Sequence, residues 1–333
     1  MSEAALDSES LQRFLNHVAS DRQPAVTSFR PISGGYSRLS ALGDVRWGDG
    51  TDETFVLRAD PPPDTGVFDS DRDEEWRLLQ ALHGHLRVHT PAPRWYDGTG
   101  EFFGAKTLIV DFFPSRPLPE VVAADGIAPA TEIFIDAITA VHATPLDVLP
   151  AEMPRPTDWD TYIDELVDLL AGIDANVADK CPQLHYVAAQ LRAHRPPPMP
   201  LTLVHGDCQP ANVLVPADGP VLMIDWEFAR VGDPREDLGY YSHLPVPPNL
   251  YEADPDGFLA RYREKTGATE EQVNHNTVSY FYVLGMARLL AQMFNAADAL
   301  HQGRPRGVMN TYMINGTAAT TKAFLAVAQQ LAG

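Results

Sequence analysis

The sequence predicts an α+β fold of two lobes, a small β-rich lobe over residues 1–113 and a larger, mainly helical lobe over residues 114–333. The length of 333 residues supports two lobes, because it exceeds what one hydrophobic core usually serves. Strand-like segments and turn glycines concentrate in the first part of the chain, whereas apolar residues recur at helical spacing in the second. A proline-rich stretch over residues 114–119 marks the crossover between them.

The first lobe begins with a short amphipathic helix, because apolar side chains recur at helical spacing between Leu11 and Val18. Two strands follow over residues 39–47 and 54–58, and the Gly-Asp-Gly turn between them predicts a hairpin. Periodicity then predicts one more helix and one more apolar strand in this lobe, over residues 71–83 and 107–113.

The second lobe is predicted to be helical, with two short strand-like interruptions. Helices are expected over residues 129–144, 158–174, 183–195, 270–300 and 310–331. The interruptions lie at residues 201–204 and 221–224, and each is followed at once by a polar motif.

Charge and cysteine content limit the functional classes. The 25 basic residues against 45 acidic residues give a formal charge of −20, which argues against a nucleic-acid partner. The two cysteines, Cys181 and Cys208, form neither a disulfide framework nor a zinc-spaced cluster, so a reducing cytoplasm is expected. The N-terminal residues do not resemble a secretory signal, and the longest apolar stretch, residues 278–294, is interrupted by polar side chains. We therefore expect a cytoplasmic protein without a membrane partner, and the sequence does not indicate its oligomeric state.

The polar motifs after the two strand-like segments carry the chemistry. Residues 205–212 read His-Gly-Asp-Cys-Gln-Pro-Ala-Asn, and Asp225 follows the apolar run Val-Leu-Met-Ile thirteen residues after Asn212. This is the order of residues used in phosphoryl transfer from a nucleotide. Magnesium prefers oxygen ligands, so the Asn212 amide and the Asp225 carboxylate are candidate metal ligands. Asp207 is the candidate catalytic base, and His205 beside it is expected to brace the catalytic loop.

The chain resembles the aminoglycoside phosphotransferase and choline kinase superfamily, which has a protein-kinase-like fold. The resemblance rests on three motifs: His-Gly-Asp-x-x-x-x-Asn at residues 205–212, Ile-Asp-Trp-Glu at 224–227, and Gly-Asp-Pro-x-x-Asp-Leu at 232–238. Element order agrees over nearly the whole chain, but only about 35 residues carry strong motif identity. In the third motif, Asp233 and Pro234 are expected to begin a helix or turn, and Asp237 to cap backbone donors.

The resemblance implies a nucleotide, ATP or GTP, bound with Mg²⁺ between the lobes. The phosphate-covering loop would be Ser33, Gly34 and Gly35, because glycines let backbone N–H groups approach phosphate closely. The strand that ends the first lobe would contact the adenine through the backbone of Val110 and Phe112.

Arg58 stands where this superfamily commonly has its ATP-binding lysine. The strand reads Val-Leu-Arg, as in a branch that resembles the kinase-like domain attached to certain acyl-CoA dehydrogenases. Arginine keeps the positive charge and binds phosphate bidentately, so Arg58 is a candidate phosphate ligand. It needs a carboxylate partner on the helix of the first lobe, and by resemblance this is Glu75, with Glu74 as its rival.

These features predict an enzyme that transfers the γ-phosphate of ATP or GTP to a hydroxyl of a small molecule, such as an aminoglycoside-like antibiotic or a hydroxylated metabolite. Gln209 replaces the lysine that protein kinases have at this position, and no Ala-Pro-Glu segment follows Asp225 at activation-loop distance. Both features favour a small-molecule acceptor over a protein. Two alternatives are a nucleotide-binding pseudokinase, suggested by Arg58, and a metal-dependent hydrolase that uses His205 and Asp207.

Overall fold

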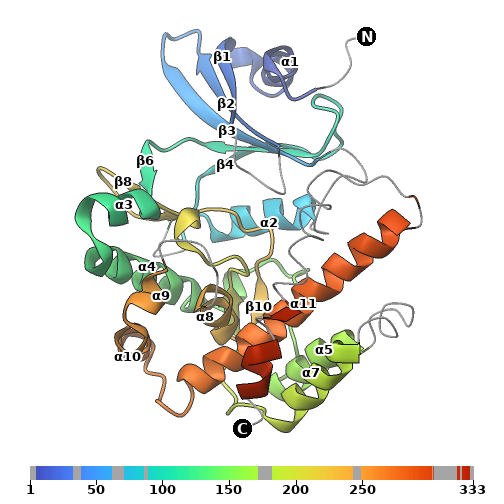
Figure 1. Cartoon of the computed structure of the whole chain (residues 1–333). Helices are drawn as coiled ribbons and strands as arrows, with labels where there is room; N and C mark the ends of the chain where they lie inside the picture. The colour runs from blue at the N-terminus through green and yellow to red at the C-terminus, as the bar shows by residue number, and fades with distance from the viewer. Residues whose placement is uncertain are drawn as a thin grey trace.

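The computed structural model describes residues 5–32, 39–61, 71–85, 89–171, 182–242 and 249–301, and isolated residues after them (303, 321–322 and 325–330). An antiparallel sheet at the N-terminal end of the chain is followed by a mostly helical region (Figure 1). This arrangement confirms the predicted α+β fold. No helix in the described part of the chain is both long and apolar enough to cross a membrane.

The N-terminal sheet has five antiparallel strands in the order β1-β2-β3-β5-β4. Their bounds are β1 Ala25–Ile32, β2 Leu39–Arg46, β3 Asp52–Ala59, β4 Pro93–Asp97 and β5 Thr107–Asp111. The predicted hairpin is β2 and β3, while β1 and β4 were not expected as separate strands. Both of these lie at the edges of the sheet, where their exposed, mixed polar and apolar residues give little periodic signal.

One helix packs on each face of this sheet. Helix α1, Ser8–Val18, covers one face with Leu11 and Phe14, in a cluster that includes Ile109 of β5. Helix α2, Arg72–Leu82, lies on the other face, where Leu108 and Val110 of β5 join the main core. Alternate residues of β5 therefore face opposite sides, as the pleat of a strand requires.

The second lobe is built from helices around two clusters of buried side chains. One is shared with α2 and includes residues of α3, α4, α8, α9 and α10, and the other includes residues of α5, α7 and α11. The helices are α3 Leu118–Asp125, α4 Ile127–His142, α5 Trp159–Ala171, α7 Pro182–Ala193, α8 Arg235–Ser242, α9 Leu250–Ala253, α10 Pro255–Thr266 and α11 His275–His301. Four of the predicted helices correspond to α4, α5, α7 and α11. The predicted helix over 310–331 lies mainly outside the described residues. Helices α3, α9 and α10 were not predicted, whereas α8 begins directly after Asp233 and Pro234, where a helix or turn was expected.

Short strands position the polar motifs. Strand β7, Thr202–Val204, pairs with β10, Arg230–Gly232, and β8, Val213–Pro216, lies between β6, Ser115–Pro117, and β9, Leu222–Met223. The catalytic loop runs between β7 and β8, and Asp225 follows β9. Strand β6 falls within the crossover expected at residues 114–119, and its pairing with β8 ties that crossover to the second lobe.

Candidate active site

The His-Gly-Asp turn is held by glycine and by a buried carboxylate. Gly206 has φ +81°, and a Cβ there would lie 2.4 Å from the carbonyl oxygen of Phe228, so only glycine fits. The carboxylate of Asp237 on α8 accepts the backbone N–H of His205 and of Gly206, each at 2.8 Å. Asp237 caps backbone donors as predicted, but the donors lie about thirty residues away in the catalytic loop.

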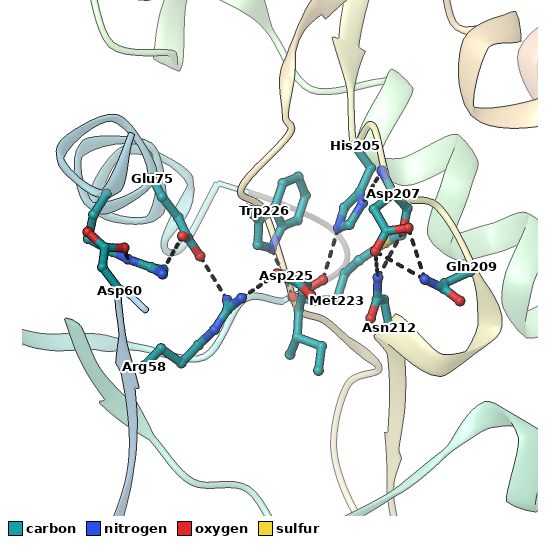
Figure 2. A network of polar contacts seen from close by, with 12 residues as sticks. Arg58, Asp60, Glu75, His205, Asp207, Gln209, Asn212, Met223, Asp225 and Trp226 are labelled. Carbon is teal, nitrogen blue, oxygen red and sulfur yellow. Dashed lines mark hydrogen bonds and ion pairs between the residues drawn. The ribbon is translucent and has the colours of Figure 1, made fainter. Parts of the chain in front are cut away.

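His205 is completely buried, and both nitrogens of its ring contact backbone groups. Its Nε2 lies 3.0 Å from the carbonyl oxygen of Ile224, and its Nδ1 accepts the backbone N–H of Asp207 at 3.3 Å. The ring also packs against Trp226, with centroids 4.7 Å apart. These contacts connect the catalytic loop to the segment that carries Asp225, which is the geometry expected of a brace (Figure 2).

The carboxylate of Asp207 receives donors from three side chains. Gln209 Nε2 donates to Oδ1 at 2.9 Å and to Oδ2 at 3.1 Å, and Asn212 Nδ2 donates to Oδ2 at 2.8 Å (Figure 2). The third donor is the hydroxyl of Tyr240 on α8, 2.6 Å from Oδ1. Burial and the neighbouring Asp207 carboxylate raise the pKa of Tyr240 well above its ordinary value, so its phenol stays protonated and donates.

Asn212 and Asp225 are brought together by a backbone hydrogen bond. The N–H of Ile224 donates to the carbonyl oxygen of Asn212 at 3.0 Å. Because Asp225 directly follows Ile224, this bond holds Asp225 close to Asn212. Because the Asn212 amide nitrogen is directed to Asp207, its oxygen is turned away from that carboxylate. Asp225 has φ +70°, a left-handed conformation that is strained for a residue other than glycine and that often occurs at functional sites.

Arg58 links the two lobes. Its Nη1 donates to Glu75 Oε1 at 2.8 Å and its Nη2 bonds to Asp225 Oδ1 (Figure 2). This confirms Glu75 rather than Glu74 as the partner of Arg58. Burial alone would lower the pKa of the Arg58 guanidinium, but the charges of Glu75 and Asp225 raise it. Burial also opposes ionisation of Asp225, yet the charge and hydrogen bond of Arg58 hold the pKa of Asp225 below its ordinary value.

The Arg58 network extends to a second buried arginine. Arg72, whose side chain has no solvent exposure, bonds to Glu75 and to Asp60, the latter at 3.2 Å. If Arg58 is removed, Glu75 therefore keeps its ion pair with Arg72, whereas Asp225 loses its ion pair with Arg58.

We expect Arg58→Met to lower the free energy of unfolding by about 2–3 kcal/mol, because a mostly buried bridge between two carboxylates is lost. Urea unfolding at neutral pH measures the change. Arg46→Met is the matched control, since its partner Asp52 and Arg46 itself are both 60% exposed. Equal losses in the two variants would contradict the structural importance of the Arg58 bridge.

The other residues predicted to contact the nucleotide lie partly within and partly outside the described part of the chain. Ser33, Gly34 and Gly35 lie outside the described residues. Val110 is a buried residue of β5, and Phe112 follows this strand, with its N–H donating to the carbonyl oxygen of Thr54 at 3.1 Å. That N–H is therefore used within the sheet and not available to a nucleotide.

A cavity of about 450 Å³ adjoins the Arg58 network on the side of α2. It is lined by residues of α2 that include Glu75, by residues 150–157, by α5, and by the segment 226–231 after Asp225. Asp207 and Asn212 do not line it.

Two sequence comparisons address the ancestry of this chain. The sequence profile of the phosphotransferase enzyme family matches residues 28–274, about three quarters of the chain. The chain belongs to this family. It is therefore a small-molecule kinase, as its motifs predict. A search of curated protein sequences finds no match.

Solved structures of the same fold cover nearly the whole chain. A ternary complex of a thermostable mutant of aminoglycoside phosphotransferase APH(4)-Ia with AMP-PNP and hygromycin B is 17% identical, with 97% of this chain and 99% of the other covered and a TM-score of 0.63. The macrolide 2′-phosphotransferase MphH from Brachybacterium faecium is 19% identical, with 96% and 97% covered and a TM-score of 0.59. A choline/ethanolamine kinase family protein from Mesorhizobium loti is 18% identical, with 98% of each chain covered and a TM-score of 0.57. At these identities the likeness establishes the fold.

Proposed function

We propose that this phosphotransferase moves the γ-phosphate of ATP, or of GTP, to a hydroxyl group of a small molecule, with Asp207 as the base. The observation that carries the proposal is the joint placement of Asp207, Asn212 and Asp225 on one braced loop and the strand-end beside it. AMP-PNP bound to APH(4)-Ia, a protein of the same fold, supports an adenine nucleotide.

Each side chain has a distinct task in this proposal. Asp207 accepts the proton of the acceptor hydroxyl while that oxygen bonds to the γ-phosphorus, the bond from this phosphorus to the β,γ-bridging oxygen breaks, and ADP or GDP leaves. Arg58 binds phosphate oxygens in place of the family lysine, oriented by Glu75. The branch with Val-Leu-Arg in this strand, inferred from the sequence, is consistent with such a role.

The oxygen ligands suit magnesium. Mg²⁺ in such sites is usually held by one or two protein carboxylates together with substrate phosphates and waters. Asp225 offers a partly exposed carboxylate and Asn212 an amide oxygen, so both would hold the ion. When bound, the ion neutralises the charge of the transferred phosphoryl group.

The acceptor class is tested by a screen. The protein is incubated with Mg²⁺ and ATP or GTP, and ADP or GDP release is coupled to a panel of hydroxylated compounds. The panel should include aminoglycosides, macrolides, choline-like amines, hydroxyacyl thioesters and sugar-like natural products. Hygromycin B is bound in the APH(4)-Ia complex, and the names of the other two proteins refer to other acceptor classes. Nucleotide binding without turnover on any acceptor would favour a regulatory pseudokinase.

Asp225→Ala should weaken Mg²⁺-dependent ATP binding by a factor on the order of 100, because it removes the proposed carboxylate ligand. Calorimetric titration with ATP, in Mg²⁺ and in EDTA, measures the effect. The variant should bind ATP equally in both conditions, whereas the parent protein should bind more tightly with Mg²⁺. Parent-like affinity in Mg²⁺ would remove Asp225 from the metal site.

A further inference from the structure

The carboxylate of Asp207 has its acceptor positions filled. Among the described residues, four hydrogen bonds from Gln209, Asn212 and Tyr240 reach its two oxygens. An ionised carboxylate offers about four lone-pair sites. A base in this state has no position left for the proton of an incoming hydroxyl, so one donor must leave before the reaction.

Two of the three donors are held by the surrounding fold. Asn212 is only 7% exposed, and its amide also donates to the backbone oxygen of Asp207 at 2.9 Å. Tyr240 lies on α8, where Gly239 approaches α11 so closely that a Cβ would lie 2.5 Å from the backbone nitrogen of Tyr282. The ring of Tyr240 also packs against the hydrophobic cluster that includes residues of α5, α7 and α11, and this packing holds its hydroxyl at Asp207.

Among the described residues, the side chain of Gln209 is held only by the Asp207 carboxylate. It lies two residues from Asp207 on the same loop, is half-buried, and makes the longest contacts of the set, 2.9 and 3.1 Å. Within the described part of the chain, its side-chain amide contacts no other hydrogen-bond partner. A rotation of this one side chain frees a position on each oxygen.

We infer that Gln209 is a placeholder for the acceptor hydroxyl. It occupies Asp207 in the acceptor-free enzyme and swings aside when a hydroxylated acceptor binds, while Tyr240 and Asn212 keep the carboxylate aimed. Tyr240 is thus a positioning residue, and Gln209 is the side chain that an acceptor displaces. This inference rests on the proposed function, since it takes Asp207 as the base.

A placeholder also limits wasteful hydrolysis of ATP. In that side reaction a water oxygen bonds to the γ-phosphorus, the bond from this phosphorus to the β,γ-bridging oxygen breaks, and the water proton passes to Asp207. The products are ADP and inorganic phosphate. While the Gln209 amide fills the carboxylate, water cannot take the acceptor position.

The test measures ADP release from MgATP with no acceptor present. Gln209→Ala should raise this hydrolysis about three- to tenfold, the factor that corresponds to losing the contact of one amide group, shared between the two carboxylate oxygens. Calorimetry should find its MgATP affinity unchanged. The double variant Asp207→Asn with Gln209→Ala should lose the gain, because the extra hydrolysis passes through Asp207. Gln190→Ala on α7 is the matched control and should hydrolyse ATP at the parent rate.

Tyr240→Phe tests the inference that Tyr240 positions the Asp207 carboxylate. Its hydrolysis should be slower, because the Asp207 carboxylate loses the hydroxyl that keeps it in position. The KM for ATP should not change. A merely structural role for Tyr240 would lower MgATP affinity or the free energy of unfolding together with the rate, and calorimetry and urea unfolding of the variant detect these losses.

Three outcomes would overturn the inference. The first is unchanged or slower ATP hydrolysis by Gln209→Ala. The second is weaker MgATP binding by that variant, which would assign Gln209 to binding the phosphates. The third is an increase in hydrolysis that persists in the double variant with Asp207→Asn. Failure of the proposed function is separate, since the parent protein would then transfer phosphate to no acceptor of the panel, whether or not it binds MgATP.

Discussion

Asp207→Asn is expected to lower phosphoryl transfer by about 10²- to 10⁴-fold while the affinity for MgATP stays close to that of the parent protein. The amide keeps the shape of the side chain but does not accept the proton of the acceptor hydroxyl. Nucleotide affinity is retained because Arg58, Asn212 and Asp225 are unchanged. Coupled ADP release measures turnover, and calorimetric titration measures binding.

The control for this variant is Asp218→Asn. Asp218 is exposed in the turn between β8 and β9 and carries the same change of charge. Because the new amide at position 207 faces donors from Gln209 and Tyr240, urea unfolding of both variants should accompany the kinetics. Full turnover by a folded Asp207→Asn protein would remove Asp207 from the position of the base.

Asp237→Ala is expected to lower the free energy of unfolding by about 3–5 kcal/mol. Asp237 is 1% exposed and accepts the N–H groups of His205 and Gly206, and His142 Nε2 lies 3.0 Å from its Oδ2. Removing the carboxylate leaves these donors without their acceptor in a buried site. Turnover should fall with stability, because the same bonds shape the catalytic loop.

Urea unfolding measures this loss, and Asp125→Ala is its control. Asp125 is 51% exposed and pairs with Arg116 at 3.4 Å, so its removal should change the free energy of unfolding by less than about 0.5 kcal/mol. A loss at Asp237 no larger than that at Asp125 would show that the catalytic loop holds its shape without this carboxylate.

The stabilisation by Asp237 should depend on pH. Burial raises the pKa of Asp237, but the hydrogen bonds and charges of His142 and His205 outweigh burial and hold its pKa below the ordinary value. In the unfolded chain the carboxyl has its ordinary pKa, so the unfolded state binds more protons between the two values. The stability difference between parent and Asp237→Ala should therefore be complete above the unfolded pKa and shrink as pH falls toward the folded one.

The sequence by itself determined many of the local elements and the chemical class. Apolar spacing from Leu11 onward is sufficient for α1, because a surface helix must bury one face. The hairpin of β2 and β3 follows from its turn glycines and alternating strands. The spacing of Asp207, Asn212 and Asp225 within twenty residues identified a phosphotransferase, because these residues act through one loop and the strand after it.

Only the tertiary structure decided how that chemistry is held. Tyr240 reaches Asp207 from 33 residues away, Asp237 caps the catalytic loop from α8, and Arg58 meets Asp225 across 167 residues. No periodicity or motif spacing encodes such contacts, because they depend on how α8 packs and on how the sheet is placed against the second lobe. The sequence was thus sufficient to predict the residues of the reaction. The contacts of Tyr240 and Gln209 with the Asp207 carboxylate could be identified only from the tertiary structure.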